Sequence, residues 1–147
     1  MFKGIPTPAL TLGLLGLIPF LLGLAQIYGY DLIPPALREN SRVNLPSTGA
    51  GLMLIYGKIV LSFMGGALWG LAAGRATWLL LILSVIPALW AFLLVGGDLV
   101  LLAFGFIGLL GIDLLFAQFG LAPKWWLRLR VMLTAVVVIC LLVPSFG

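Results

Sequence analysis

The chain has 147 residues, of which 63% are hydrophobic and 8% are charged, with a formal net charge of +4. Soluble domains carry roughly 25% charged residues, so the composition excludes a water-facing globule, and the charge is too dilute for a nucleic-acid surface. The chain has no histidine and one cysteine, Cys140, which excludes histidine-ligated haem, the usual zinc and copper sites and an internal disulfide.

Long apolar runs, continuous rather than alternating, make up most of the chain. In lipid, backbone polar groups must be satisfied internally, and continuous apolar runs favour helices over a barrel. We therefore predict an all-α polytopic membrane protein, a five-transmembrane-helix bundle in a single membrane domain over residues 1–147. The five predicted spans are residues 8–28, 50–73, 78–95, 99–119 and 125–143.

The first span begins after a short basic head and resembles a signal peptide. Its apolar run is long for a signal, so we expect it to persist as a membrane helix. Pro19 lies mid-span, where it removes a backbone donor and frees the carbonyl of Leu15, so a kink is expected there. Residues 29–49 form the one long polar connection, predicted to be a solvated loop with one or two helical turns over 35–43.

Short turns join the remaining spans. Arg75 and Thr77 lie in the turn between the second and third spans, and Asp98 is predicted to cap the start of the fourth. With five spans, the two termini lie on opposite sides of the membrane.

The distribution of basic residues predicts the orientation. The side of the N-terminus receives Lys3, Arg75, Lys124, Arg128 and Arg130. The opposite side receives Arg38, Arg42 and, near that end of the second span, Lys58. Because basic residues are enriched in cytoplasmic segments, we predict a cytoplasmic N-terminus and a C-terminus on the opposite side of the membrane.

Asp113 is a carboxylate inside the predicted fourth span. Burying it costs several kcal/mol unless it is paired or protonated. Arg128 and Arg130 lie at a matching depth in the fifth span, so we predict an ion pair across the hairpin. These two arginines point some 200° apart, so at most one of them faces Asp113. The alternative is a proton-relay or ion-site carboxylate.

Three other side chains are predicted to anchor the protein at the membrane interface. Trp69 and Trp125, together with the neighbouring tryptophans, gather near the inner interface, where indole rings are favoured. Lys58 can extend its long stem toward the outer interface. A carboxylate of a neighbouring protein and an anionic lipid are the alternative partners for Lys58.

Gly66, Gly70 and Gly74 are spaced by four and share one face of the second span. Small residues at this spacing let another helix approach closely. The face serves either an internal neighbour or another protein. Ser62 and Ser84 have no base to activate them, so no hydrolase site is predicted and we expect no enzymatic activity.

Four motifs and Asp113 occur in a familiar order: GLLGLIPF, YGKIVLSFMGGALWG, SVIPALW and WWLRLRVMLT. The chain resembles a family of uncharacterised small membrane proteins that occurs in proteobacteria and has a mitochondrial transmembrane relative. The resemblance implies a five-helix integral membrane protein of unknown function, in the bacterial inner membrane, where the C-terminus would be periplasmic, or in its mitochondrial counterpart. It carries over no catalytic role to any residue of this chain. Lys58 departs from the family pattern, in which a small residue is expected after Tyr-Gly.

Three classes of function follow. The first is a structural or accessory subunit of a larger inner-membrane complex, respiratory or photosynthetic, with membrane lipids as further partners and no cofactor of its own. The second is a small proton-coupled transporter that uses Asp113. The third is a membrane enzyme or assembly factor acting on lipid or quinone, and no group of residues in the sequence supports this class.

Overall fold

A computed structural model describes residues 4–146; Lys3, which entered the prediction of orientation, lies outside this range. Its regular secondary structure is helical throughout those residues, so the predicted all-α class is confirmed. The helices are α1 (Thr7–Leu15), α2 (Ile18–Ile27), α3 (Pro35–Glu39), α4 (Gly49–Ala72), α5 (Trp78–Leu93), α6 (Leu99–Gln118) and α7 (Trp126–Phe146).

Among residues 4–146, four helical segments are long and apolar enough to cross a membrane: α1 with α2 (Thr7–Ile27), α4, α6 and α7. The polytopic membrane class is therefore confirmed, and these segments imply contacts with lipid. The apolar helix α5 has 16 residues and is about 24 Å long at 1.5 Å per residue. It is shorter than the roughly 30 Å hydrocarbon core and ends two residues before the span predicted for this part of the chain.

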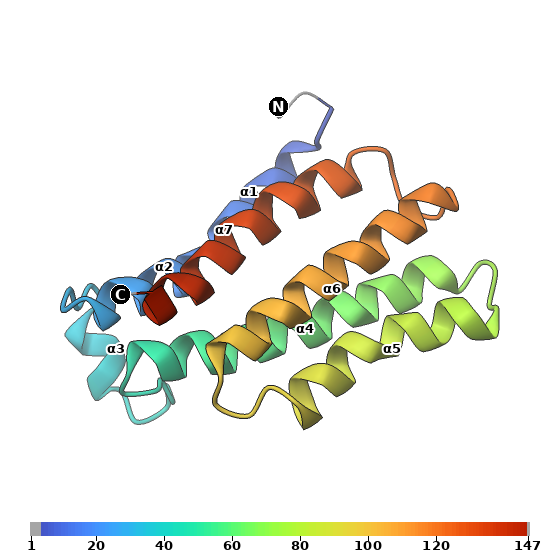
Figure 1. The fold of residues 1–147 in the computed structure, drawn as a ribbon. Helices are drawn as coiled ribbons and strands as arrows, with labels where there is room; N and C mark the ends of the chain where they lie inside the picture. Colours follow the sequence, from blue (N-terminus) through green and yellow to red (C-terminus); the bar gives the residue numbers. More distant parts are fainter. Residues whose placement is uncertain (1–3, 147) are drawn as a thin grey trace.

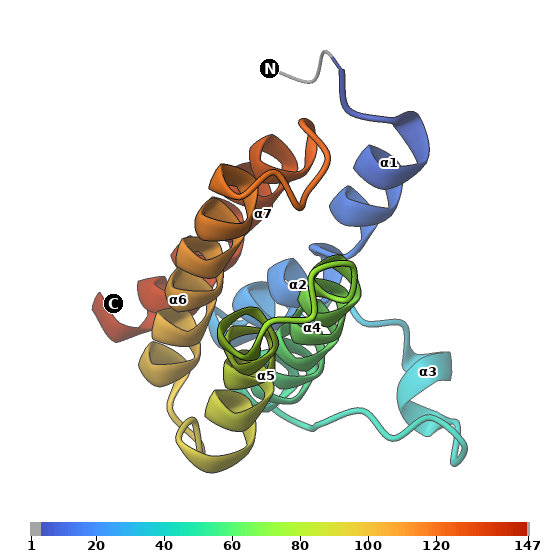
Figure 2. The ribbon, with the colours of Figure 1, turned by 90° about the vertical axis from the view of Figure 1, so that its right-hand side faces the viewer.

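The apolar helical segments, with α5 included, each run antiparallel to the next one in the chain, as Figure 1 shows. Helix α4 packs against α2, α5 and α6, and α7 packs against α6 and, less extensively, against α1 and α2; Figure 2 shows α6 and α7 side by side and α2 next to α4. The α4–α5 and α6–α7 turns lie at the end of the bundle where α1 begins. The α3 connection, the α5–α6 turn and the C-terminus lie at the opposite end.

The first apolar segment is broken at Gly16–Leu17, between α1 and α2. The kink predicted from Pro19 is thus present as an interruption of the helix. The hydroxyl of Tyr56 donates to the carbonyl oxygen of Gly16 at 3.0 Å, which pairs a backbone group at the break with a side chain of α4. A helix break in lipid is tolerated where a neighbour supplies such a partner.

Close helix crossings occur at other glycines than the predicted ones. A Cβ at Gly49 would overlap the carbonyl oxygen of Gly23, so α2 and α4 touch backbone to backbone there. A Cβ at Gly65 would lie 2.8 Å from the carbonyl oxygen of Ser84, which places α5 directly against this point of α4. Both contacts depend on the missing side chain.

The face predicted for helix packing is a different one. A Cβ added at Gly66, Gly70 or Gly74 meets no heavy atom within 4 Å among the described residues. The prediction that this face could pack an internal neighbour is therefore wrong. One residue along a helix corresponds to about 100° of rotation, and α5 lies on the Gly65 side of α4 instead.

Candidate functional site

Asp113 lies on the buried face of α6, against α7, with 1% of its surface exposed. Its two carboxylate oxygens have separate donors. Arg130 Nε donates to Oδ2 at 2.9 Å, and Trp126 Nε1 donates to Oδ1 at 2.8 Å. Arg130 itself is 6% exposed, so the structure places a paired, hydrogen-bonded charge cluster between two helices.

Helix spacing explains this arrangement. Trp126 and Arg130 are four residues apart on α7 and therefore share one face. The tight turn after α6 brings that face opposite Asp113 (Figure 1). Of the two arginines considered as partners, Arg130 makes the pair, whereas the side chain of Arg128 is exposed. Sequence reasoning assigned Trp126 to the membrane interface and missed its bond to Asp113, although its spacing from Arg130 carried the signal.

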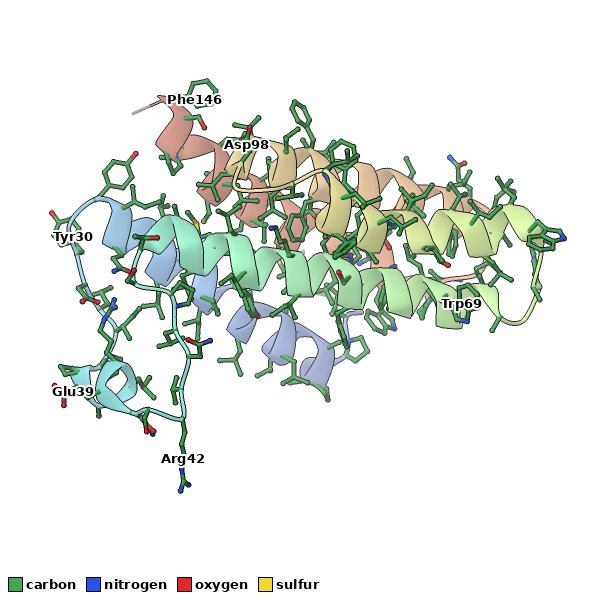
Figure 3. All side chains as sticks on the ribbon, turned by 90° about the horizontal axis from the view of Figure 1, so that it is seen from below. Tyr30, Glu39, Arg42, Trp69, Asp98 and Phe146 are labelled. Atoms are coloured by element: carbon green, nitrogen blue, oxygen red, sulfur yellow. The ribbon has the colours of Figure 1, made fainter. Side chains whose placement is uncertain are left out.

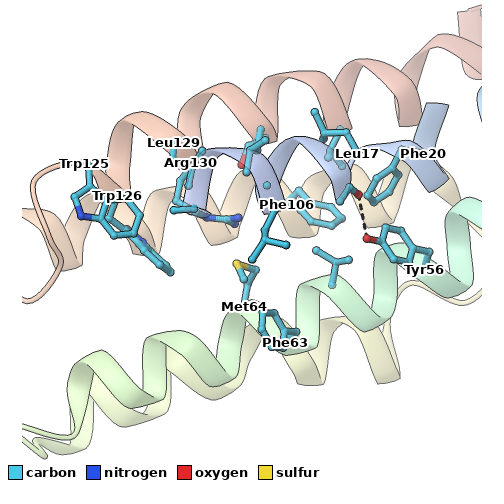
Figure 4. A pocket seen from close by; sticks show the side chains of 18 residues that line it. Leu17, Phe20, Tyr56, Phe63, Met64, Phe106, Trp125, Trp126, Leu129 and Arg130 are labelled. Atoms are coloured by element: carbon cyan, nitrogen blue, oxygen red, sulfur yellow. Dashed lines mark hydrogen bonds between the residues drawn. The ribbon is translucent and has the colours of Figure 1, made fainter. Parts of the chain in front are cut away.

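A cavity of about 400 Å³ lies beside this cluster, lined mainly by residues of the α1–α2 segment, α4, α6 and α7; in Figure 4, α4 lies across the cavity from α7. Most of its walls are apolar. The lining residues are Ala9, Leu12, Gly13, Gly16, Leu17, Phe20, Tyr56, Val60, Phe63, Met64, Phe106, Trp125, Trp126, Leu129, Arg130, Leu133, Thr134 and Val137.

Two polar atoms at this cavity are buried without a hydrogen-bond partner in the part of the chain that the structure describes. They are Arg130 Nη2 and Thr134 Oγ1. In Figure 4 the guanidinium of Arg130 extends from α7 into the space above Met64. Buried polar groups in native proteins are almost always paired, so these two atoms mark the place where the cavity can hold an external group.

The predicted interface anchors lie away from this cavity, with one exception. Lys58 Nζ donates to the carbonyl oxygen of Gly96 at 2.7 Å, just beyond the end of α5. Trp69 is exposed near the α4–α5 turn (Figure 3). Trp125 is half-buried and lines the cavity beside Trp126, with ring centroids 6.0 Å apart. The anchoring role of all three remains a prediction.

Within residues 4–146 no group of three or more His, Cys, Asp and Glu side chains could hold a metal ion. The chemistry of the site is therefore described by one ion pair, an indole donor, two unpaired polar atoms and an apolar wall.

Comparison with known proteins identifies the family of this chain, which has no described activity. Residues 5–146 match the family described as "Protein of unknown function (DUF3429)". The chain is also similar to Transmembrane protein 69 of Xenopus tropicalis, at 35% identity over 148 residues that cover 95% of this chain. It spans about half of that relative's length, 54%. No solved structure matches. The chain thus belongs to the DUF3429 family of proteins of unknown function.

Proposed function

We propose that this protein is a non-enzymatic structural or accessory subunit that docks on a larger complex in the bacterial inner membrane. The observation that carries the proposal is the open glycine face of α4 and of the turn that follows it, formed by Gly66 and Gly70 on α4 and Gly74 in the turn. All three are exposed, and nothing lies within 4 Å of a Cβ built on any of them. The proposed occupant is a transmembrane helix of the partner complex.

The physics of helix association in lipid supports this occupant. Apolar side chains gain little by moving from lipid to a protein surface, so transmembrane helices associate where small residues allow close van der Waals packing. The opposite side of α4 is already used, since Gly57 and Leu61 are buried in the bundle. The glycine face is thus the side of α4 on which a further helix can approach closely.

The contacts of Asp113 give less support to a proton-coupled transporter. A relay carboxylate needs a free oxygen that reaches water or a second proton carrier. Both oxygens of Asp113 instead accept hydrogen bonds from α7, from Trp126 and Arg130. The cluster is better suited to holding α6 and α7 together.

We further propose that α5 is a fifth crossing, with the N-terminus cytoplasmic and the C-terminus periplasmic. In support, the turns that precede and follow α5 lie at opposite ends of the bundle (Figure 1). The end with the α4–α5 turn carries Arg75, Lys124 and Arg128, whereas the opposite end carries Arg38 and Arg42. This bias matches the enrichment of basic residues on the cytoplasmic side.

A pull-down with a matched glycine variant tests the docking face. Wild type, Gly70→Leu and Gly111→Leu are tagged, extracted in a mild detergent and compared by native gel and mass spectrometry. Gly111, on α6, also has open space around a built Cβ, so at both positions the new side chain starts in open space rather than against a neighbouring helix. We expect a stoichiometric large partner with wild type and Gly111→Leu, and its loss with Gly70→Leu.

Equal recovery of the partner with Gly70→Leu would contradict the docking face. A homo-oligomer without any larger partner would replace the accessory-subunit proposal with self-association. Thermal unfolding of each purified variant serves as the control, since an unfolded Gly70→Leu protein would lose its partner trivially.

A further inference from the structure

The cavity beside Asp113 ends in two polar groups that the fold itself leaves unpaired. Arg130 and Thr134 are four residues apart, on one face of α7, and are 6% and 4% exposed. Within residues 4–146, neither Arg130 Nη2 nor Thr134 Oγ1 has a hydrogen-bond partner. A threonine hydroxyl in a helix commonly bonds back to the carbonyl four residues earlier, and Thr134 does not do so.

These groups fix the chemistry of a suitable partner atom. A guanidinium N–H can only donate, and a hydroxyl can donate as well. An oxygen with two lone pairs, held between the two side chains, would satisfy both. Most of the remaining walls, which include Leu17, Phe20 and Phe106, are apolar and suit a hydrocarbon or ring body. A few polar groups in an apolar cavity of several hundred Å³ is the usual form of a small-molecule site.

The charge of the cluster selects against an anion. Arg130 already has its counter-charge, because Asp113 lies 2.9 Å from its Nε. A carboxylate or phosphate bound at Nη2 would add a second negative charge to a buried pair that is balanced without it. An uncompensated charge in a buried site is strongly unfavourable, so an uncharged acceptor fits best.

The approach to the cavity is from the lipid. Leu12 and Phe63 both line it, on α1 and α4, and are 69% and 70% exposed. In Figure 4, Phe63 lies at the edge of the cavity, away from Arg130. The opening therefore faces the apolar surface that contacts acyl chains, and a ligand dissolved in the bilayer can enter sideways.

We propose that this cavity binds an uncharged membrane amphiphile, with its carbonyl oxygen bound by Arg130 and Thr134 and its apolar body along α1, α2 and α4. A quinone ring carbonyl and a lipid ester carbonyl share this chemistry. The site is independent of the proposed glycine docking face, because it lies between helices of this chain.

The test uses the full chain in nanodiscs of ether-linked phosphatidylcholine, which contains no ester carbonyl. Decylubiquinone, dioleoylglycerol, oleate and dodecane are added separately. Binding is read from the midpoint of thermal unfolding, which a ligand of the native state raises by mass action, and from a one-to-one complex in native mass spectrometry. We expect decylubiquinone or dioleoylglycerol to bind, and the one that does identifies the source of the carbonyl.

Thr134→Val tests the contact itself, because valine has nearly the same shape and lacks the hydroxyl. We expect it to raise the unfolding midpoint of the ligand-free protein, since it removes an unpaired buried group. Affinity should fall by about threefold to tenfold, the equivalent of one hydrogen bond. Thr134→Ser should keep the binding, and Val60→Phe, which fills the cavity, should abolish it.

Each other outcome overturns the proposal. Equal binding by Thr134→Val removes the assigned contact. Equal binding of oleate removes the uncharged class, and equal binding of dodecane shows an apolar cavity without carbonyl recognition. Binding of neither carbonyl probe by the wild-type protein removes the site.

Discussion

Arg130 reaches Asp113 across the α6–α7 hairpin, with its Nε 2.9 Å from Oδ2. The side chains of Arg130 and Asp113 are 7% and 1% exposed. Within residues 4–146, each is the ion-pair partner of the other. A buried pair of this kind contributes little net stability compared with apolar residues, but loss of one partner leaves a buried charge uncompensated. The hairpin is therefore sensitive to single substitutions at this point.

Asp113→Asn should lower the free energy of unfolding by about 3–5 kcal/mol, because it leaves Arg130 charged and unpaired. Thermal unfolding in detergent measures the change. Asp31→Asn is the matched control: Asp31 pairs with Arg38 at 3.1 Å on the surface, and exposed pairs contribute about 0–1 kcal/mol. Similar stability for the two variants would contradict the proposal that the Asp113–Arg130 pair holds α6 and α7 together.

Trp126→Phe should weaken the same cluster by a smaller amount. The substitution keeps an aromatic ring and removes only the indole N–H that donates to Asp113 Oδ1 at 2.8 Å. A hydrogen bond to a charged group contributes about 1.5–3 kcal/mol. A double-mutant cycle combines Trp126→Phe with Asp113→Asn. Residues in contact show a coupling free energy of about 0.5 kcal/mol or more in such a cycle. Strict additivity would show that the two residues act independently.

Gly65→Ala and Gly66→Ala, one residue apart, should act in opposite directions. At Gly65 the new Cβ would lie 2.8 Å from the backbone oxygen of Ser84, and such overpacking costs about 1–3 kcal/mol. At Gly66 the Cβ meets open space, and alanine in a helix is favoured over glycine by about 1 kcal/mol. The unfolding midpoints of the two variants measure the difference. A stabilised Gly65→Ala variant would show that α5 does not pack against Gly65.

Composition and the length of the apolar runs were enough to predict the all-α membrane class and the approximate extent of the long helices. Local signals also worked. The kink near Pro19 is present at Gly16–Leu17, and Asp98 caps α6 by accepting from the backbone N–H of Val100 at 2.8 Å. These features depend on residues close together in the chain, so a single sequence contains the information.

The rest depends on the rotation of one helix relative to another. The choice between Arg128 and Arg130, and between Gly65 and Gly66, changes with a rotation of one or two residues about a helix axis. The sequence gives the spacing along each helix but not this rotation, which the turns and the packing of the whole bundle determine. The cavity is less predictable still, because α1, α2, α4, α6 and α7 all contribute to it.

Reporter fusions after Ala76 and after Gly147 test the orientation and the fifth crossing together. If α5 crosses, alkaline phosphatase should be active after Gly147 and inactive after Ala76, and a cytoplasmic fluorescent reporter should show the reverse. If α5 does not cross, the two fusion points fall on the same side of the membrane. Phosphatase activity at Ala76 alone would invert the predicted orientation.

Lys58→Met should loosen the end of α5 without unfolding the bundle. The Lys58 ammonium donates to the carbonyl of Gly96 at 2.7 Å, where it satisfies a backbone acceptor beyond the helix end and opposes the negative end of the helix dipole. Methionine keeps an apolar stem of similar length and removes the charge. We expect the free energy of unfolding to fall by about 0.3–1 kcal/mol. Hydrogen exchange should be faster at the amide of Asp98, which donates to the carbonyl oxygen of Val95 at 3.0 Å.

Lys124→Met, at the opposite end of the bundle, is the control that removes one charge without touching this turn. Unchanged exchange at Asp98 in Lys58→Met would leave Lys58 with a role at the lipid interface alone.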